Sequence, residues 1–262
     1  MTKAVNPKAG TRPSKARIRA SFERAAPTYD GAADIQRRIC TQLADGLPAI
    51  APTRLLDAGC GTGFAQAELQ VRFPDAHCVA VDLSPAMLKR ISSPCCRIAG
   101  DLEHLPLAAA SVDLYWSSLA VQWCDLARAL GEARRVLRAG GAVAIASLGP
   151  ATFHELRSAF AGVDRHRHTL SFHSADEIGA LANATGLGAV NVEMHTEIAH
   201  YPDFKSLLRG VKAIGANQVG AGRRPGLLSR SAFQRAELAS EAMRGAAGLP
   251  LTYDVITLHA RT

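Results

Sequence analysis

A short glycine-rich segment, LLDAGCGTGF (55–64), has residue types and spacing suited to holding a ligand. Apolar residues lead into Asp57, and Gly59, Gly61 and Gly63 follow at alternate positions. Such glycines let the backbone turn sharply with positive φ and approach a ligand with no Cβ in the way. The free N–H groups of a helix that begins just after the loop would face the same ligand. The segment therefore predicts a buried strand, a binding loop and a helix.

The acid before the loop indicates which ligand suits it. A dinucleotide fingerprint is G-x-G-x-x-G and binds pyrophosphate at the helix N-terminus, whereas the pattern here is G-x-G-x-G. Asp57 would repel a pyrophosphate but favours a cationic group. The sequence D-A-G-C-G-T-G resembles motif I of S-adenosylmethionine-dependent methyltransferases with the Rossmann-like fold, and their cofactor carries a sulfonium and an α-ammonium group. The alternative is a structural turn in another α/β protein.

Residues after the second predicted strand suit the ribose and adenine of that cofactor. Asp82 comes 19 residues after Gly63, a spacing at which an acid accepts hydrogen bonds from both ribose hydroxyls. The alternative for Asp82 is a helix N-cap. Leu83 and Met87 follow it, and the thioether of Met87 either packs on the adenine face or belongs to the core.

Two more strand ends contribute candidates. In AGDLEHLPL, Asp101 can accept a hydrogen bond from the adenine amino group while the Leu102 N–H reaches a ring nitrogen; the alternative is a turn aspartate. This segment resembles the G-D-x-x-x-L-P motif of the same methyltransferases. Ser117 and Ser118 end the fourth predicted strand, and ligands bind at the carboxyl ends of such strands. We therefore expect these serines to line the sulfur end of the cofactor.

Alternating strand and helix patterns position these residues. The predicted strands are 54–57, 77–81, 96–99, 112–117 and 141–147, with helices at 64–72, 85–91 and 125–138. Ser84-Pro85 is typical of a helix start, and Ala139-Gly140-Gly141 is predicted to end the helix before the fifth strand. The alternation predicts an α/β fold with a parallel sheet and helices on both faces.

The ends of the chain depart from this alternation. A helix is predicted from Ser174 to about 185, AVNVEMHTEI and YDVITLHA alternate as strands do, and 203–245 shows a helical pattern. The resemblance implies a seven-stranded, mostly parallel sheet whose last strand is antiparallel between two others. Residues 1–16 are predicted to be a disordered basic tail. Residues 17–262 would then form one methyltransferase domain, with lid helices over 17–47 and a helical insertion over 203–245.

Composition argues against several classes of protein. The 262 residues are 48% hydrophobic, which is enough for one large domain, yet no apolar run approaches the ~20 residues of a membrane span. The N-terminus lacks the apolar region of a secretory signal, and the six cysteines form no C-x-x-C pair. We therefore expect a cytoplasmic protein with reduced thiols and no metal site.

The net charge of +7 is concentrated in two segments. Residues 1–24 carry seven Lys/Arg against one acid, and 205–244 carry eight against two. Such segments suit an acidic partner, either nucleic acid or an acidic carrier protein; the alternative is a solvated face and a flexible tail. Because the segments lack interleaved aromatic residues for base stacking, we expect no stable nucleic-acid complex.

Three segments outside the cofactor motifs indicate the methyl acceptor. SFERAAPTYDGAADIQRRI (21–39), SSLAVQW (117–123) and LLRGVKAIGAN (207–217) resemble the malonyl-acyl-carrier-protein O-methyltransferases of biotin synthesis. Ser118 stands where that family usually has Asn, and Val211 where it has Leu. The resemblance covers about residues 17–262. It implies methylation of a malonyl carboxylate carried on acyl carrier protein or on coenzyme A.

Three residues of these segments are candidates for the acceptor side. The resemblance makes Tyr29 a lid residue near the methyl donor, with simple packing as its alternative. Arg209 and Lys212, in the predicted insertion, could hold the malonyl carboxylate or dock the carrier, since arginine binds carboxylates bidentately; the alternative is a solvated helix face. Other functions left open are another small-molecule carboxylate or quinone methyltransferase, an RNA-modifying protein and a cofactor-binding protein without catalysis.

Overall fold

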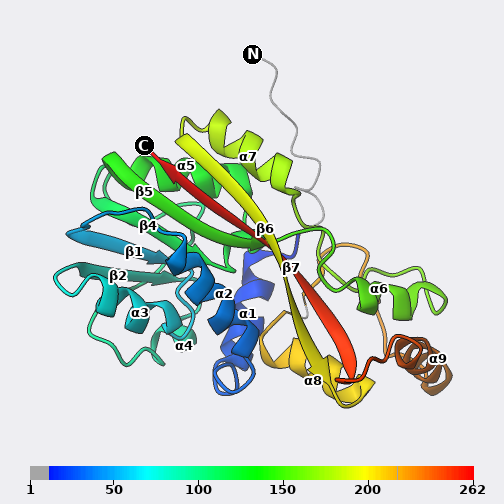
Figure 1. Cartoon of the computed structure of the whole chain (residues 1–262). Helices are drawn as coiled ribbons and strands as arrows, with labels where there is room; N and C mark the ends of the chain where they lie inside the picture. Colours follow the sequence, from blue (N-terminus) through cyan, green and yellow to red (C-terminus); the bar gives the residue numbers. More distant parts are fainter. Residues whose placement is uncertain (1–11, 217) are drawn as a thin grey trace.

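A seven-stranded sheet in the order β3-β2-β1-β4-β5-β7-β6 forms the centre of the computed structural model, which describes residues 12–216 and 218–262 (Figure 1). The strands are β1 (Arg54–Ala58), β2 (His77–Asp82), β3 (Cys96–Ala99), β4 (Val112–Ser118), β5 (Leu137–Leu148), β6 (Gly188–Tyr201) and β7 (Leu249–Arg261). The first five strands pair in parallel, whereas β7 lies between β5 and β6 and runs antiparallel to both. This confirms the predicted α/β fold, including the antiparallel last strand.

Helices cover both faces of the sheet. They are α1 (Lys15–Ala25), α2 (Asp34–Asp45), α3 (Phe64–Arg72), α4 (Pro85–Leu88), α5 (Leu126–Val136), α6 (His154–Ala161), α7 (Ala175–Ala184), α8 (Phe204–Ala213) and α9 (Arg230–Glu241). Apolar residues of α2 and α3 are buried in the core cluster on one face, and those of α5 and α7 in the cluster on the other. The parallel strands are therefore buried on both sides, as their continuous apolar sequences require.

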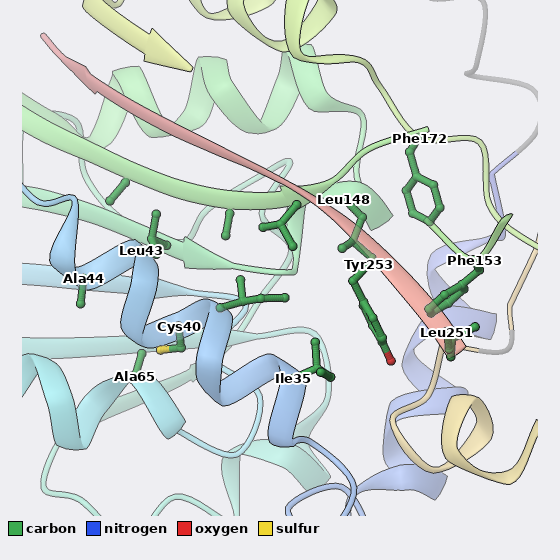
Figure 2. Packing of buried hydrophobic residues seen from close by; sticks show 14 of the residues in the cluster. Ile35, Cys40, Leu43, Ala44, Ala65, Leu148, Phe153, Phe172, Leu251 and Tyr253 are labelled. Carbon is green, nitrogen blue, oxygen red and sulfur yellow. The ribbon is translucent and has the colours of Figure 1, made fainter. Parts of the chain in front are cut away.

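Strand β4 shows how one sequence serves both layers. Leu114 and Trp116 belong to the cluster under α2, and Tyr115 between them belongs to the cluster under α5, because successive side chains of a strand point to opposite faces. On α2, Ile39 and Leu43 are fully buried, and Figure 2 shows Leu43 among the sticks that lie between this helix and the strands. Helix α2 is therefore a core helix, and the predicted lid stays a prediction for α1 and the loop after it.

The predicted insertion contains α8 and α9, joined to the long ends of β6 and β7 (Figure 1). Phe204 of α8 lies with its ring 6.0 Å from that of Phe160 on α6 and 5.6 Å from that of Phe233 on α9. These aromatic contacts attach the insertion to the rest of the domain. No helix in the described residues is both long and apolar enough to cross a membrane.

Two predicted boundaries are wrong. Helix α5 ends at Val136 and β5 begins directly after it, so Ala139-Gly140-Gly141 lies inside a strand. Gly140 has a φ of 77°, and the register between β4 and β5 shifts along this stretch, so the glycines form a strand irregularity. At the N-terminus, residues 1–11 lie outside the described residues, but α1 already begins at Lys15. The ordered domain thus starts before the predicted boundary at residue 17.

Candidate active site

The glycine loop connects β1 to α3 with positive φ at all three predicted glycines. The φ angles of Gly59, Gly61 and Gly63 are 76°, 53° and 90°. A Cβ on Gly59 would lie 2.2 Å from the Cβ of Ala120, whereas a Cβ on Gly61 would enter open space. Gly59 and Gly61 line a cavity, but Gly63 does not; a Cβ there would press on the Ile91 side chain at 3.2 Å. Gly63 therefore shapes the turn into α3 and does not face the ligand.

Asp82, at the end of β2, is held against this loop. Its Oδ2 accepts a hydrogen bond from the Gly61 N–H at 2.9 Å, and its Oδ1 accepts one from the Ser84 N–H at 2.7 Å. Burial raises the pKa of Asp82, and the two N–H donors oppose that rise. Each carboxylate oxygen has a second lone pair, and Asp82 lines the cavity. The predicted acceptor for ribose hydroxyls is therefore positioned for that role.

Asp57 is a buried acid with an unused oxygen. Only 2% of its surface is exposed, and its Oδ2 has no hydrogen-bond partner among the described residues. Burial, together with the charge of nearby Asp82, raises the pKa of Asp57 to about 7, although Gln66 opposes the shift. An unpaired buried carboxylate is unfavourable unless a cation or donor meets it. The α-ammonium group of S-adenosylmethionine supplies both, so Asp57 fits the predicted cofactor.

The other predicted cofactor residues surround a cavity beside this acid, which we call the adenosine cavity. Asp82, Leu83, Met87, Asp101 and Leu102 line it together with Lys15 of α1. The Lys15 Nζ lies 2.8 Å from the Asp101 Oδ1 and 2.6 Å from Glu103. Burial alone would lower the pKa of Lys15, but the nearby Cys124, Asp101 and Glu103 hold it above its usual value. The N-terminal helix thus closes one side of the cavity, and the other Asp101 oxygen stays available to an adenine amino group.

Ser117 is a correction to the predicted site. Its side chain is fully buried, and its hydroxyl donates to the Ala58 carbonyl at 2.7 Å, so it holds β4 to β1. Ser118 lines both cofactor cavities instead. The reason is the alternation of side chains along a strand, which sends neighbouring serines in opposite directions.

Tyr29 lies where three cavities meet. It lines the adenosine cavity, a methionine cavity formed by Asp57, Gly59, Gly61 and Thr62, and a third, largely apolar acceptor cavity. Its ring stacks on Phe64, with 5.8 Å between centroids and 24° between planes. The acceptor cavity is lined by Leu148, Phe153, Phe172 and Tyr253, which gather at one end of the core in Figure 2, and by residues from α1, α2 and the insertion. A methyl donor and an acceptor in adjoining cavities would thus meet beside Tyr29.

Comparison with known proteins identifies the family. Residues 56–145 match the family model described as a methyltransferase domain. The chain is 74% identical over 261 residues, covering 100% of both chains, to the malonyl-[acyl-carrier protein] O-methyltransferase of Dechloromonas aromatica. The chain belongs to the malonyl-[acyl-carrier protein] O-methyltransferase family. This confirms the resemblance found in the sequence.

Other relatives of this methyltransferase agree. It is 37% identical to the biotin biosynthesis bifunctional protein BioHC of Cellvibrio japonicus, covering 93% of this chain and 49% of that protein. Its fold is similar to that of phosphoethanolamine N-methyltransferase 2 of Haemonchus contortus in complex with S-adenosyl-L-methionine. That structure gives a TM-score of 0.54 and 16% identity, covering 92% of this chain and 57% of the other. The fold class and the S-adenosylmethionine cofactor predicted from the glycine loop are confirmed.

Two glutamines of the methyltransferase face the acceptor cavity. Gln36 and Gln122 line the cavity, and the Oε1 of each is buried without a hydrogen-bond partner among the described residues. The Gln122 Nε2 donates to the Leu119 carbonyl at 2.7 Å, and Gln36 hydrogen-bonds the Tyr253 side chain. Gln122 lies in the LAVQW segment, whose resemblance to the family could have indicated that this glutamine belongs to the site. The cavity therefore offers neutral polar groups to an acceptor.

The structure does not bring Arg209 and Lys212 to the cavities of this methyltransferase. Phe204, Leu207 and Val211 form the buried face of α8, and Arg209 and Lys212 project from the exposed side. None of the three cavities is lined by either residue. Among the described residues, no charged side chain lines the acceptor cavity at all. The structure therefore does not support direct binding of a carboxylate inside that cavity by Arg209 or Lys212.

Proposed function

We propose that this chain transfers a methyl group from S-adenosylmethionine to the free carboxylate of malonyl-acyl carrier protein, forming the methyl ester at an early step of biotin synthesis. The observation that carries this proposal is the 74% identity over the full chain to a protein of that name. The relation to a bifunctional biotin biosynthesis protein supports the pathway. The two adjoining cofactor cavities and the separate acceptor cavity are the architecture that such a transfer needs.

The reaction depends on alignment of the methyl donor with the acceptor carboxylate more than on acid–base catalysis. Bound S-adenosylmethionine supplies an electrophilic methyl group on a sulfonium. A malonyl carboxylate is already ionised at neutral pH, so no side chain has to remove a proton. Asp57 and Asp82 hold the cofactor at the ends of β1 and β2, and the apolar acceptor cavity excludes water. The transfer requires only that a carboxylate oxygen and the methyl carbon be held in line.

Tyr29 is the residue best placed to complete that alignment. Burial, with the charges of Asp82 and Asp30, raises the pKa of the Tyr29 hydroxyl well above its usual value, so the hydroxyl stays protonated and can donate a hydrogen bond. Its position between the donor and acceptor cavities allows that bond to reach an acceptor oxygen. We assign Tyr29 to orienting the carboxylate and closing the site, with α1 and the following loop as the lid.

The exposed cations of the insertion are better placed to bind the carrier protein than to bind the malonyl carboxylate. Arg209 and Lys212 lie on the solvent side of α8, and Arg223 and Arg230 are also exposed. Leu227, between the latter two in sequence, is 96% exposed. A single apolar side chain among cations suits an acidic, partly apolar protein surface. Such charges would raise the rate of encounter and orient the carrier more than they would add affinity.

Genetic complementation tests the proposed function. A biotin-requiring strain that lacks this methyltransferase should grow without biotin when it expresses the chain. The Asp82→Ala variant should not restore growth, because it loses an acceptor for the cofactor ribose and the partner of the Gly61 N–H. Immunoblotting confirms that both proteins accumulate to the same level. Growth that still depends on biotin with the wild-type chain present contradicts the proposal.

One alternative acceptor deserves a parallel assay. Because no described charged residue lines the acceptor cavity, an uncharged aromatic acceptor such as a quinone would also avoid an unpaired buried charge. A panel of malonyl thioesters and short-chain quinones, each offered with labelled cofactor, separates the two. Label transfer to a quinone at a higher kcat/KM than to malonyl-acyl carrier protein would favour the alternative.

A further inference from the structure

A fourth cavity, which the cofactor and acceptor chemistry leaves unused, lies beside the acceptor cavity. It has a volume of about 440 Å³ and lies between α6 and the segment 164–172. We call it the basic cavity because its ionisable lining residues are Arg157, Arg167, His166, His168 and a single acid, Asp164. It is open to solvent, unlike the buried site around Tyr29.

The basic cavity and the acceptor cavity share a wall. Thr169, Leu170 and Phe172 line both. A long, narrow substrate could therefore lie with one end in the basic cavity and pass this wall to reach Tyr29. The substrate under the proposed function has that shape, because a carrier or coenzyme holds its malonyl thioester at the end of a pantetheine arm. The other end of such an arm is a phosphate ester.

The cations of the basic cavity are available to an anion. The Arg157 guanidinium donates to the Pro150 carbonyl at 2.9 Å, to the Thr152 carbonyl at 2.5 Å and to the Thr169 Oγ1 at 3.4 Å, and all three acceptors are neutral. The Arg167 Nη2 donates to the Ser171 Oγ at 2.6 Å, which is also neutral. Among the described residues, neither arginine forms an ion pair with a carboxylate. No direct ion pair therefore neutralises their positive charges, although the charge of Glu155 acts on Arg157.

The one acid of the cavity is already paired. Asp164 lies 2.9 Å from the His168 Nε2 and 2.9 Å from an Arg224 nitrogen. Burial opposes its ionisation, but hydrogen bonds from His168, the His166 N–H and Arg224 lower the Asp164 pKa to about 2. Asp164 thus stays ionised and pairs with Arg224 and His168, so it fixes the loop without forming an ion pair with Arg157 or Arg167. The cavity keeps an excess of positive charge.

The insertion holds the same loop in place. The Arg167 backbone N–H donates to the Gly222 carbonyl at 2.8 Å, and Arg224 reaches Asp164 from the same insertion segment. Carrier docking on the insertion, as proposed above, would place the carrier next to this cavity. A phosphate at the attachment point of the arm would then lie near Arg167.

We propose that the basic cavity binds the phosphate of the pantetheine arm, with Arg167 as its principal ligand and Arg157 as a supporting charge. The proposal rests on the proposed function, because it assumes a malonyl thioester on such an arm. Arginine matches phosphate with two parallel N–H···O bonds. The phosphate contact sets how far the arm enters, and so places the malonyl carboxylate beside Tyr29.

Matched thioesters test the phosphate site. Malonyl-phosphopantetheine and malonyl-pantetheine differ only in the phosphate, and kcat/KM is measured for each with wild-type chain, Arg167→Gln and Arg165→Gln. Arg165 is exposed, carries the same charge two residues away and does not line the cavity, so it controls for general surface charge. Thermal melts establish that each variant is folded.

We expect the wild-type chain to favour the phosphorylated thioester by about tenfold, the loss expected for one charge-assisted hydrogen bond. Arg167→Gln should remove most of that preference, and Arg165→Gln should leave it within twofold. No wild-type preference, or an equal loss of preference in both variants, would overturn the phosphate site. If the wild-type chain methylates neither thioester nor malonyl-acyl carrier protein, the proposed function itself fails.

The source of the phosphate is decided in the same assay. Malonyl-acyl carrier protein presents the phosphate of the arm as a phosphodiester to the protein, and malonyl-coenzyme A presents it as part of a diphosphate linked to a nucleotide. The natural source is the one with the higher wild-type kcat/KM that also loses about tenfold in Arg167→Gln. If neither full-size substrate responds to Arg167→Gln, the phosphate site is rejected even where the short thioesters show a difference.

Discussion

The pH dependence of cofactor binding tests whether Asp57 receives the cationic end of S-adenosylmethionine. Burial and the charge of Asp82 raise the Asp57 pKa to about 7, so most chains carry a neutral Asp57 in mildly acidic solution. A cation binds the ionised form, and below pH 7 binding must therefore release a proton. Between pH 5.5 and 7.0 the ionised fraction rises from about 3% to about 50%, so the affinity should rise roughly tenfold.

In the free protein, ionisation of Asp57 lowers stability as the pH rises, which is the opposite of its effect on cofactor affinity. A raised carboxyl pKa means that the fold favours the protonated form, so the contribution of Asp57 is fully present below the ordinary aspartate pKa of 3.8 and is lost progressively as the pH rises to about 7. The full shift corresponds to a penalty on the order of 4 kcal/mol above that pH. S-adenosylmethionine should relieve part of this penalty. The cofactor should therefore raise Tm more at pH 7.0 than at pH 5.5.

Isothermal titration calorimetry at constant ionic strength measures the affinity, and buffers of different ionisation enthalpy count the protons released. The ligand's α-amino group titrates near 7.7–8.0, above the window used, so it stays charged throughout. Asp57→Asn is the matched control, because it keeps the shape of the side chain without its titration. We expect weaker binding with no slope in that variant. A flat pH profile in the wild-type chain, or a slope that persists in Asp57→Asn, would show that Asp57 does not receive the cationic end of the cofactor.

Four further perturbations test other parts of the structure. Asp82→Ala should lower cofactor affinity at least 100-fold in calorimetry, since it removes charge-assisted bonds to ribose and the partner of the Gly61 N–H; unchanged affinity rejects the ribose role. Gly59→Ala should lose about 3 kcal/mol of stability from overpacking against Ala120 and from positive φ, or roughly 8 °C in Tm. Gly61→Ala, with the same sign of φ but open space, should lose about 1 kcal/mol while weakening cofactor binding; equal melting losses in both variants would show that the contact is unimportant. Charge reversal of Arg223 and Arg230 together should raise KM for malonyl-acyl carrier protein several-fold and spare a short malonyl thioester, most clearly at low salt; an equal loss on both substrates rules out docking there.

The cofactor half of the site could be predicted from the sequence because its chemistry is local. Asp57 and the glycines are joined by a few residues of chain, and Asp82 and Asp101 follow strands whose carboxyl ends must meet at one edge of a parallel sheet. The phase of a strand is less certain, so both Ser117 and Ser118 were expected to line the cofactor cavity, whereas only Ser118 does. The raised pKa of Asp57 depends on burial by distant segments, so the sequence alone could not predict it.

The acceptor half depends on contacts between distant segments. The acceptor cavity combines residues from α1, α2, the segment after β5, the insertion and β7, and no local pattern places these together. Helix α6 was not predicted, although Phe153, Leu156 and Phe160 have helical spacing and are buried. For Arg209 a signal was present: the stripe of Phe204, Leu207 and Val211 already directs it to solvent. The basic cavity depends on how α6 packs against the loop that follows it, and no local pattern predicts that packing.

Intact-mass measurement of malonyl-acyl carrier protein, after incubation with this chain and S-adenosylmethionine, shows directly whether the malonyl carboxylate is methylated. The carrier should gain the mass of one CH₂ group, fragmentation should place it on the malonyl carboxylate, and alkaline hydrolysis should remove it. Acetyl-acyl carrier protein, which has no free carboxylate, should gain nothing. An unchanged malonyl carrier while calorimetry shows bound cofactor, or equal methylation of the acetyl carrier, would contradict the proposed function.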